Sequence, residues 1–145
     1  MRCVFCEIAK GMAPAYKIYQ SEEVVCFLDS DPINEGHVLI APCKHYLDVD
    51  AVPEKTLSEI MALSQRIVKV LREKYHPDGY SIMQNGGIFN DVGHYHLHIF
   101  PRYQGDGFAW TFGDAPREVT GPIAEELRRL LKEQGAGPAW EELQA

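Results

Sequence analysis

Three histidines alternate with bulky residues in one short segment, His94-Tyr95-His96-Leu97-His98, and no other feature constrains this chain as much. If the segment is a β-strand, alternate residues share a face, so the three imidazoles point to one side and the bulky side chains to the other. The bulky side is typical of a core face, and the histidine side gathers groups that titrate near neutral pH. Half of the six histidines of the chain lie here, which indicates chemistry rather than chance.

Length and charge set the broad class of the protein. A chain of 145 residues is long enough to bury a core, and its length is typical of one domain. Its net charge of -7 argues against non-specific binding to nucleic acid or to an anionic membrane, although a local site can oppose the overall charge. No apolar run approaches a membrane span, and the first residues open no signal peptide. We therefore expect a cytoplasmic protein without a nucleic-acid or membrane partner.

Turn-forming residues and the spacing of apolar residues predict the secondary structure. The expected helices cover residues 3–10, 53–75 and 123–133, and the expected strands cover residues 16–19, 24–29, 37–42, 79–84 and 94–100. The last helix is expected to pack through its apolar residues, which are Ile123, Leu127, Leu130 and Leu131. Strands joined mainly by short turns, together with one long helix, are typical of an α+β fold with an antiparallel sheet of about five strands.

The histidine segment allows three classes of chemistry. It could hold a catalytic metal, since alternating histidines on a strand can bind zinc, and that site would need an open coordination position. It could supply a nucleophile, since histidine attacks phosphorus through an unprotonated nitrogen while its other ring nitrogen donates a hydrogen bond. It could also bind a ligand without turnover. A further histidine at the start of a predicted strand, His37 after Gly36, favours the nucleophile.

The triad followed by Ile99-Phe100, together with the upstream Gly36-His37, resembles the histidine-triad (HIT) family, whose signature is His-φ-His-φ-His-φ-φ with φ apolar. The resemblance extends from about residue 3 to residue 110. It is nearest to a bacterial branch of small nucleotide hydrolases, in which the triad strand continues as it does here into Pro101-Arg102-Tyr103. It implies one HIT-like domain over residues 1–145, with its core over about 3–110 and a C-terminal helix and tail over about 116–145.

The resemblance implies an enzyme that hydrolyses or transfers a nucleotidyl group. His96 matches the nucleophile that attacks the α-phosphorus, and a covalent nucleotidyl-histidine then forms and is resolved by water. His98 and His37 match the supporting histidines, and the carbonyl of His94 matches the acceptor for the nucleophile's other nitrogen. No metal is needed for this chemistry. The implied substrate is a purine nucleotide derivative, either a dinucleoside polyphosphate or a nucleoside phosphoramidate, and the implied assembly is a homodimer.

The resemblance also implies substrate-binding residues. Asp29 matches the acidic residue that holds the ribose hydroxyls, Asn85 matches a loop asparagine near the phosphate, and Asn90 stands in place of a glutamine. The apolar base pocket is matched by Phe5, Ile8, Phe27 and Leu39. Asp91 departs from the family pattern, because it replaces a hydroxyl residue that contacts the phosphate or protonates the leaving group. An ionised carboxylate repels a phosphate, so we expect Asp91 to face away or to act elsewhere, and the choice between the two substrates stays open.

Cys3 and Cys6 form a C-x-x-C pair, a spacing that suits zinc or a redox couple. No parallel βαβ unit surrounds the pair, which weighs against the redox couple. In some HIT relatives this pair binds zinc together with two histidines, and the matching positions here are His45 and His94. The resemblance therefore implies a closed structural zinc site beside the active site. Two further readings stay open, a nucleotide-binding regulatory module and a zinc hydrolase with the triad as ligands.

Overall fold

The computed structural model describes residues 2–136 and divides the chain into two compact units, with the boundary between Phe108 and Ala109. Each unit is described by itself. Among the described residues, every helix is too short or too polar to cross a membrane.

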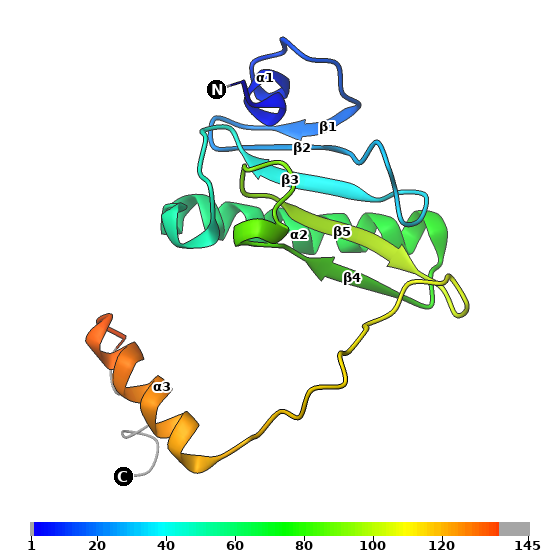
Figure 1. Cartoon of the computed structure of the whole chain (residues 1–145). Helices are drawn as coiled ribbons and strands as arrows, with labels where there is room; N and C mark the ends of the chain where they lie inside the picture. Colours follow the sequence, from blue (N-terminus) through cyan, green and yellow to red (C-terminus); the bar gives the residue numbers. More distant parts are fainter. Residues whose placement is uncertain (1, 137–145) are drawn as a thin grey trace. The chain divides into compact units, whose positions relative to one another are not determined.

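The first unit is built on one antiparallel sheet of five strands in the order β1-β2-β3-β5-β4 (Figure 1). The strands are β1 (Lys17–Gln20), β2 (Val24–Leu28), β3 (Val38–Pro42), β4 (Gly79–Met83) and β5 (Leu97–Arg102). The helices of this unit are α1 (Val4–Ala9) and α2 (Glu54–Tyr75), with short 3-10 turns at Val49–Ala51 and Gly87–Phe89. This is the α+β fold that the sequence predicts.

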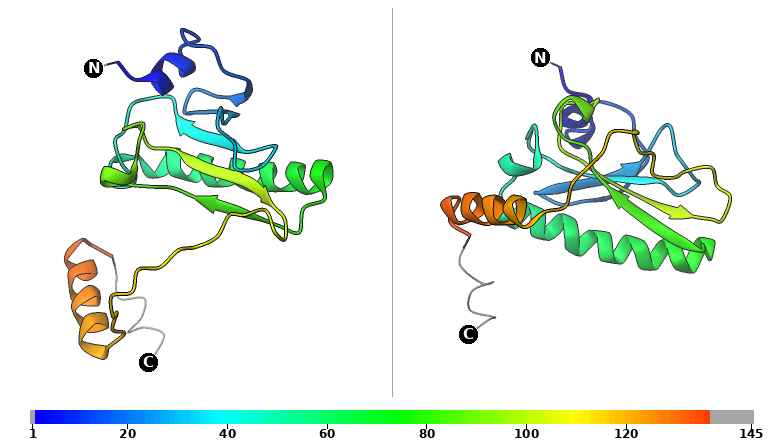
Figure 2. Two further views of the ribbon diagram at one scale, coloured as in Figure 1. Left: turned by 45° about the vertical axis from the view of Figure 1, so that its right-hand side comes forward. Right: turned by 60° about the horizontal axis from the view of Figure 1, so that its bottom comes forward.

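The long helix α2 covers one face of the sheet, which Figure 2 shows from the side. Every second residue of the three central strands faces it, so the core on this side is apolar: Val24, Cys26, Val38, Ile40, Leu97 and Ile99 from the strands, with Ile60, Leu63, Ile67, Val68 and Leu71 from α2. Burial raises the pKa of the Cys26 thiol to about 12, as expected for a cysteine that serves as a core residue.

The opposite face of the sheet receives the short helix α1. Its buried side chains Phe5 and Ile8 pack on Val25, Phe27, Leu39 and Ala41, the alternate residues of β2 and β3. His98 is paired with Leu39 in the sheet, so it lies on this same face. Alternate residues of the strands therefore face opposite sides of the sheet. One side packs against α2, and the other packs against α1 and carries His98.

The histidine strand begins later than the sequence predicts, at Leu97 instead of His94. The pairing of β3 with β5 runs out at Ile40↔Leu97, and two residues further along β3 stands Pro42, which has no N–H to continue the ladder. The carbonyl of Pro42 accepts a hydrogen bond from the His94 side chain at 2.9 Å instead. The alternation survives this change, because Tyr95 still packs in the α2 core.

The second unit contains one helix, α3 (Gly121–Glu133), among its described residues. Thr120 caps its N-terminus by accepting a hydrogen bond from the Ile123 N–H at 3.5 Å. The expectation that its apolar residues are buried is wrong for this structure, because no side chain of α3 is buried and those of Ile123, Leu127, Leu130 and Leu131 are 41% to 61% exposed. The helix has an apolar stripe but no partner for it within its own unit.

Candidate active site and metal centre

The imidazole of His96 is held in one tautomer by the main chain. Its Nδ1 donates to the carbonyl oxygen of His94 at 2.8 Å. A neutral imidazole carries one proton, so Nε2 keeps a free lone pair. His96 is only 4% exposed, yet no buried polar side-chain atom among the described residues lacks a hydrogen-bond partner, so the unpartnered Nε2 reaches accessible space.

A second set of hydrogen bonds places the protons of the two supporting histidines. The backbone N–H of Ile33 donates to Nδ1 of His37 at 3.1 Å, so the proton of His37 is on Nε2. That Nε2–H donates to Nδ1 of His98 at 2.9 Å, so the proton of His98 is on its own Nε2. His98 lines the same space as His96 and offers it an N–H donor.

Burial keeps these two supporting histidines neutral. Desolvation is the largest cause that lowers the pKa of His98 to about 4, and the neighbouring His96 and His37 lower it further. Desolvation also lowers the pKa of His37, against the opposing effect of Asp29. Near neutral pH both side chains are therefore uncharged, and His98, which lines the cavity with its Nε2–H, is the one that can donate to a ligand.

His96 and His98 line a cavity of about 1030 Å³. All four apolar residues predicted for the base pocket line it as well, namely Phe5, Ile8, Phe27 and Leu39. The Phe5 ring meets the rings of Phe27 and His96 edge-on, with centroids 5.2 and 5.1 Å apart. Asp29 lines the cavity too, and its Oδ2 lies 3.4 Å from Nε2 of His37. The fold thus brings the predicted nucleophile, the ribose carboxylate and the apolar slot to one cavity.

Two predicted substrate-binding residues do not line this cavity. Asn85 is exposed, outside the set of lining residues. The Asn90 side chain is engaged in its own loop, where its Nδ2 donates to the Leu47 carbonyl at 3.2 Å and its Oδ1 accepts from the N–H groups of Val92 and Gly93. Asn90 therefore shapes the approach to the triad in this structure.

Asp91 lies where the sequence analysis does not expect it. The residue lines the cavity beside His96 and His98 instead of facing away. It follows Asn90, whose side chain closes the turn on the next two N–H groups. An aspartate at position 91 predicts repulsion of a phosphate. Where its carboxylate lies depends, however, on the backbone conformation of this turn.

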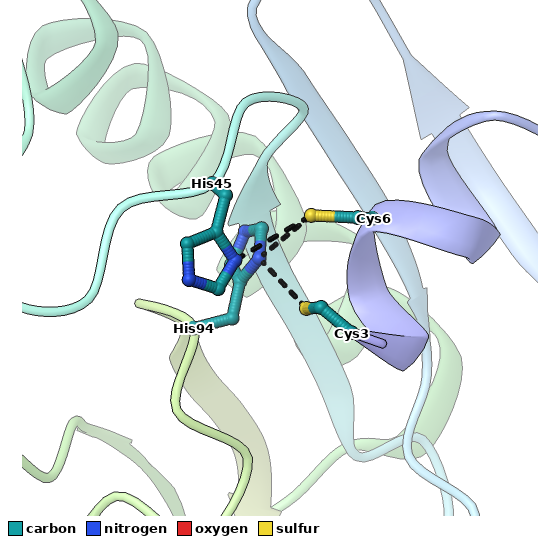
Figure 3. Close-up of side chains that lie close together, drawn as sticks. All are labelled: Cys3, Cys6, His45 and His94. Atoms are coloured by element: carbon teal, nitrogen blue, oxygen red, sulfur yellow. Dashed lines mark hydrogen bonds between the residues drawn. The ribbon is translucent and has the colours of Figure 1, made fainter. Parts of the chain in front are cut away.

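The four predicted metal ligands come together from distant parts of the chain (Figure 3). The sulfur of Cys3 lies 3.3 Å from Nδ1 of His94, and the sulfur of Cys6 lies 3.5 Å from Nδ1 of His45 and 3.6 Å from that of His94. Around a tetrahedral zinc, a sulfur and a nitrogen ligand would be about 3.5 Å apart. Burial and the neighbouring Cys3 raise the pKa of the Cys6 thiol, as expected for close thiols without a cation between them.

His94 joins this metal-ligand cluster to the nucleophile. Its Nε2–H donates to the Pro42 carbonyl, so its Nδ1 is unprotonated and turned toward the two sulfurs. Its own carbonyl accepts the Nδ1–H of His96. Burial lowers the pKa of His94, which favours the neutral form that a metal ligand needs. The side chain of His94 thus belongs to the metal-ligand cluster, while its backbone carbonyl orients the ring of His96.

The triad does not form a metal site of its own. Of the two groups of possible metal ligands among the described residues, neither contains His96, which is the residue that a zinc hydrolase built on the triad would require. The second group joins Asp29, His37 and His98. Its His37 Nε2 carries a proton because Ile33 occupies Nδ1, so this group is a hydrogen-bonded arrangement rather than a ligand set.

The sequence analysis missed the N–H of Ile33, which sets the proton order of His37 and His98. A backbone amide is present at every residue except proline, so no residue type at position 33 signals its role.

Comparison with known proteins finds relatives that align with most of this chain. The chain is 38% identical over 128 residues to an uncharacterised HIT-like protein of Methanocaldococcus jannaschii, an alignment that covers 87% of this chain and 98% of the relative. It is 33% identical over 138 residues to an adenosine 5'-monophosphoramidase of Candida albicans, covering 89% of this chain and 91% of that protein. The solved structure of a zinc-bound histidine triad family protein from Mycobacterium smegmatis matches with a TM-score of 0.69 and 39% identity, over 78% of this chain and 84% of that one.

The HIT domain model matches residues 10–105, a stretch that includes all of β1 to β5 and both histidine positions that face the cavity. The match covers more than half of the chain. The chain is therefore a member of the HIT domain family.

Proposed function

We propose that the protein is a nucleotidyl hydrolase or transferase that acts on the α-phosphate of a purine nucleotide derivative through a nucleotidyl-His96 intermediate. The observation that carries this proposal is the proton order of the site. His96 keeps an unprotonated Nε2 because its Nδ1–H is bound to the His94 carbonyl, and His98 offers an N–H to the same cavity. A nucleophile and a phosphate donor thus face one space without any proton rearrangement.

The proposed reaction has two displacements at phosphorus. In the first, the Nε2 lone pair of His96 forms a bond to the α-phosphorus, and the bond to the leaving group breaks with its electron pair. The Nδ1–H stays on the His94 carbonyl, which stabilises the positive charge that the ring acquires. In the second, water attacks the phosphorus, and His96 departs with the electrons of the P–N bond. His98 donates its Nε2–H to the phosphate through both steps, and His37 orients His98 through its own Nε2–H.

The remaining substrate contacts follow the cavity. The apolar slot of Phe5, Ile8, Phe27 and Leu39 would hold the purine. Asp29 would accept hydrogen bonds from the ribose hydroxyls. Asn85 and Asn90 remain proposed phosphate contacts only if their loop moves on binding, since neither lines the cavity here. The relative from Candida albicans, an adenosine 5'-monophosphoramidase, supports adenosine as the nucleoside.

We also propose a structural zinc held by Cys3, Cys6, His45 and His94. The convergence of the four ligand atoms and the tautomer of His94 support it, as does the zinc-bound relative from Mycobacterium smegmatis. A closed site with four protein ligands has no open position, so the chemistry would need no metal. The zinc would instead fasten the start of α1 beside the cavity.

Assembly and location are further parts of the proposal. The resemblance to the HIT family supports a homodimer, and the net charge of -7 supports a protein without nucleic-acid or membrane partners in the cytoplasm. Light scattering after size exclusion tests the first point, because a monomer at micromolar concentration would contradict it.

Intact-protein mass spectrometry during turnover tests the mechanism. The substrates are adenosine 5'-phosphoramidate and diadenosine tetraphosphate, and the reactions are quenched without acid. Wild type should gain one adenylyl group, His96→Ala should gain none and lose turnover, and the exposed His76→Asn should behave as wild type. Turnover that survives in His96→Ala overturns the mechanism. Nucleotide binding without any turnover in wild type would favour the regulatory module.

A further inference from the structure

The cavity proposed to receive a phosphate has an unusual charge. Its charged lining residues are three carboxylates, those of Asp29, Asp31 and Asp91, and no lysine or arginine lines it. Proteins that bind several phosphates ordinarily supply lysine or arginine for them. Here the phosphate donor that lines the cavity is His98, whose side chain burial keeps neutral. The cavity therefore suits a single phosphate charge better than a polyphosphate.

Asp91 is a carboxylate close to His98 that is free to act on what leaves the phosphorus. Asp29 is engaged by the Asp31 N–H at 2.9 Å and lies within 3.6 Å of both supporting histidines. Asp91 is exposed, has no hydrogen bond or ion pair among the described residues, and stands in the turn that leads into the triad. It lies near enough to His98 to oppose the lowering of that histidine's pKa.

We infer that Asp91 is a specificity-determining residue that selects leaving groups bearing a positive charge and disfavours polyphosphate leaving groups. This inference rests on the proposed function and names its substrate class, which is an adenosine phosphoramidate whose amine part carries an ammonium group. Attraction to the carboxylate favours such a tail, and the same carboxylate repels a second or third phosphate.

The reaction balances for this substrate class. The P–N bond of the phosphoramidate breaks with its electron pair going to the amine nitrogen, while the His96–phosphorus bond forms. Water then attacks, and its oxygen becomes part of the nucleoside monophosphate. The amine takes up two protons from solvent in the first step and leaves as an ammonium ion, and the attacking water returns its two protons to solvent, so the monophosphate leaves as a dianion. The total charge is the same before and after the reaction.

A matched pair of substrates tests the inference. Both carry AMP on a P–N bond of the same kind, one with a two-carbon tail ending in an ammonium group and the other with a two-carbon tail ending in a carboxylate. The value of kcat/KM is measured for each, and for diadenosine tetraphosphate, without added divalent cation. The enzymes are wild type, Asp91→Asn, and Asp50→Asn, which removes the same charge from an exposed residue outside the cavity lining.

We expect wild type to prefer the ammonium tail, and Asp91→Asn to reduce that preference by roughly tenfold while it improves the use of diadenosine tetraphosphate. Asp50→Asn should keep the wild-type ratio, and added salt should bring the wild-type ratio toward one. Equal use of both tails by wild type, or an unchanged ratio in Asp91→Asn, overturns the inference. The absence of an adenylyl adduct with every substrate would instead overturn the proposed function.

Discussion

His98 has a pKa that couples the active site to the stability of the fold. In the folded protein its pKa is lowered to about 4, chiefly by burial, whereas the unfolded chain protonates near the ordinary value of 6.5. A histidine with a lowered pKa is neutral in both states above pH 6.5, so it costs no stability there. As the pH falls from 6.5 toward 4, the unfolded state takes up the proton first and the folded state loses stability.

This loss of stability at low pH predicts a difference between wild type and a variant that lacks His98. Between pH 7 and pH 4.5 the free energy of unfolding of wild type should fall more than that of His98→Gln, by about 1–2 kcal/mol, because glutamine cannot titrate. Urea unfolding at a series of pH values measures the difference. His76→Asn, which replaces an exposed histidine, should follow the wild-type curve. A His98→Gln curve parallel to wild type would contradict the assignment of a lowered pKa to His98.

At the scale of elements, the loop between β2 and β3 is fitted to the end of α2. Gly36 in this loop has a φ of +88°, and a Cβ placed there would lie 2.5 Å from Cε2 of Tyr75, the last residue of α2. An alanine would therefore face both left-handed backbone strain and a collision with a ring. The loop also carries Ile33 and delivers His37 to the site.

Gly36→Ala should consequently destabilise the protein by about 2–4 kcal/mol. Gly11→Ala is the matched control, since Gly11 has a φ of +74° but open space around its Cβ position, and its cost should be only about 1 kcal/mol. Thermal unfolding of the two variants separates strain from collision. Equal losses would mean that Tyr75 moves aside without cost.

The elements show what the sequence could predict and what it could not. Helix α2 is evident from its apolar spacing, and it ends as expected at His76, which adopts the left-handed conformation before Pro77. The start of β5 is not evident, because it depends on where the pairing with β3 ends, which is at Ile40↔Leu97, two residues before Pro42. Apolar spacing also predicts α3 correctly but says nothing about whether its stripe meets a partner.

The candidate site, too, is predictable from the sequence only in part. The resemblance to the HIT family points to the histidines, the cysteines and Asp29, because the chemistry of the family requires those side chains at those positions. The direction of Asp91 and the engagement of Asn90 depend on the course of one turn. The donor to His37 is a backbone group that any residue could supply. These features follow from conformation, which one sequence does not reveal.

At the scale of the whole molecule, the proposed zinc would fasten the N-terminal segment to the sheet. Cys3 is the N-cap of α1 and Cys6 lies within that helix, whose residues Val4, Phe5 and Ile8 line the cavity. Loss of the proposed zinc should therefore release α1 and open one wall of the cavity, while α2 and its core stay folded.

Replacing Cys3 by serine tests this coupling. Cys3→Ser should lower Tm by roughly 5 °C or more and should weaken the binding of AMP. Hydrogen exchange should quicken in residues 3–10 but not in α2. Cys43→Ser is the control, since Cys43 is outside the cluster. Slow exchange in residues 3–10 of Cys3→Ser would mean that apolar packing alone holds α1.

We also expect the first unit to fold without the second. Both apolar cores of the first unit are built from its own residues, none of them later than Ile99. A protein ending at Phe108 should unfold cooperatively with a Tm within about 3 °C of the full chain. Circular dichroism during heating measures this, and a broad or absent transition would show that residues 109–145 contribute to the first unit's core.

The bond from Ile33 to His37 has a consequence for how such a site evolves. Every residue except proline carries the N–H that places the proton of His37. Position 33 is therefore free to drift among side chains across descendants without disturbing the site, yet one particular replacement, proline, would release the order of protons on which His98 depends. A comparison of related sequences would show position 33 as variable and therefore unimportant, although a mutation of this residue to proline would remove the proposed activity.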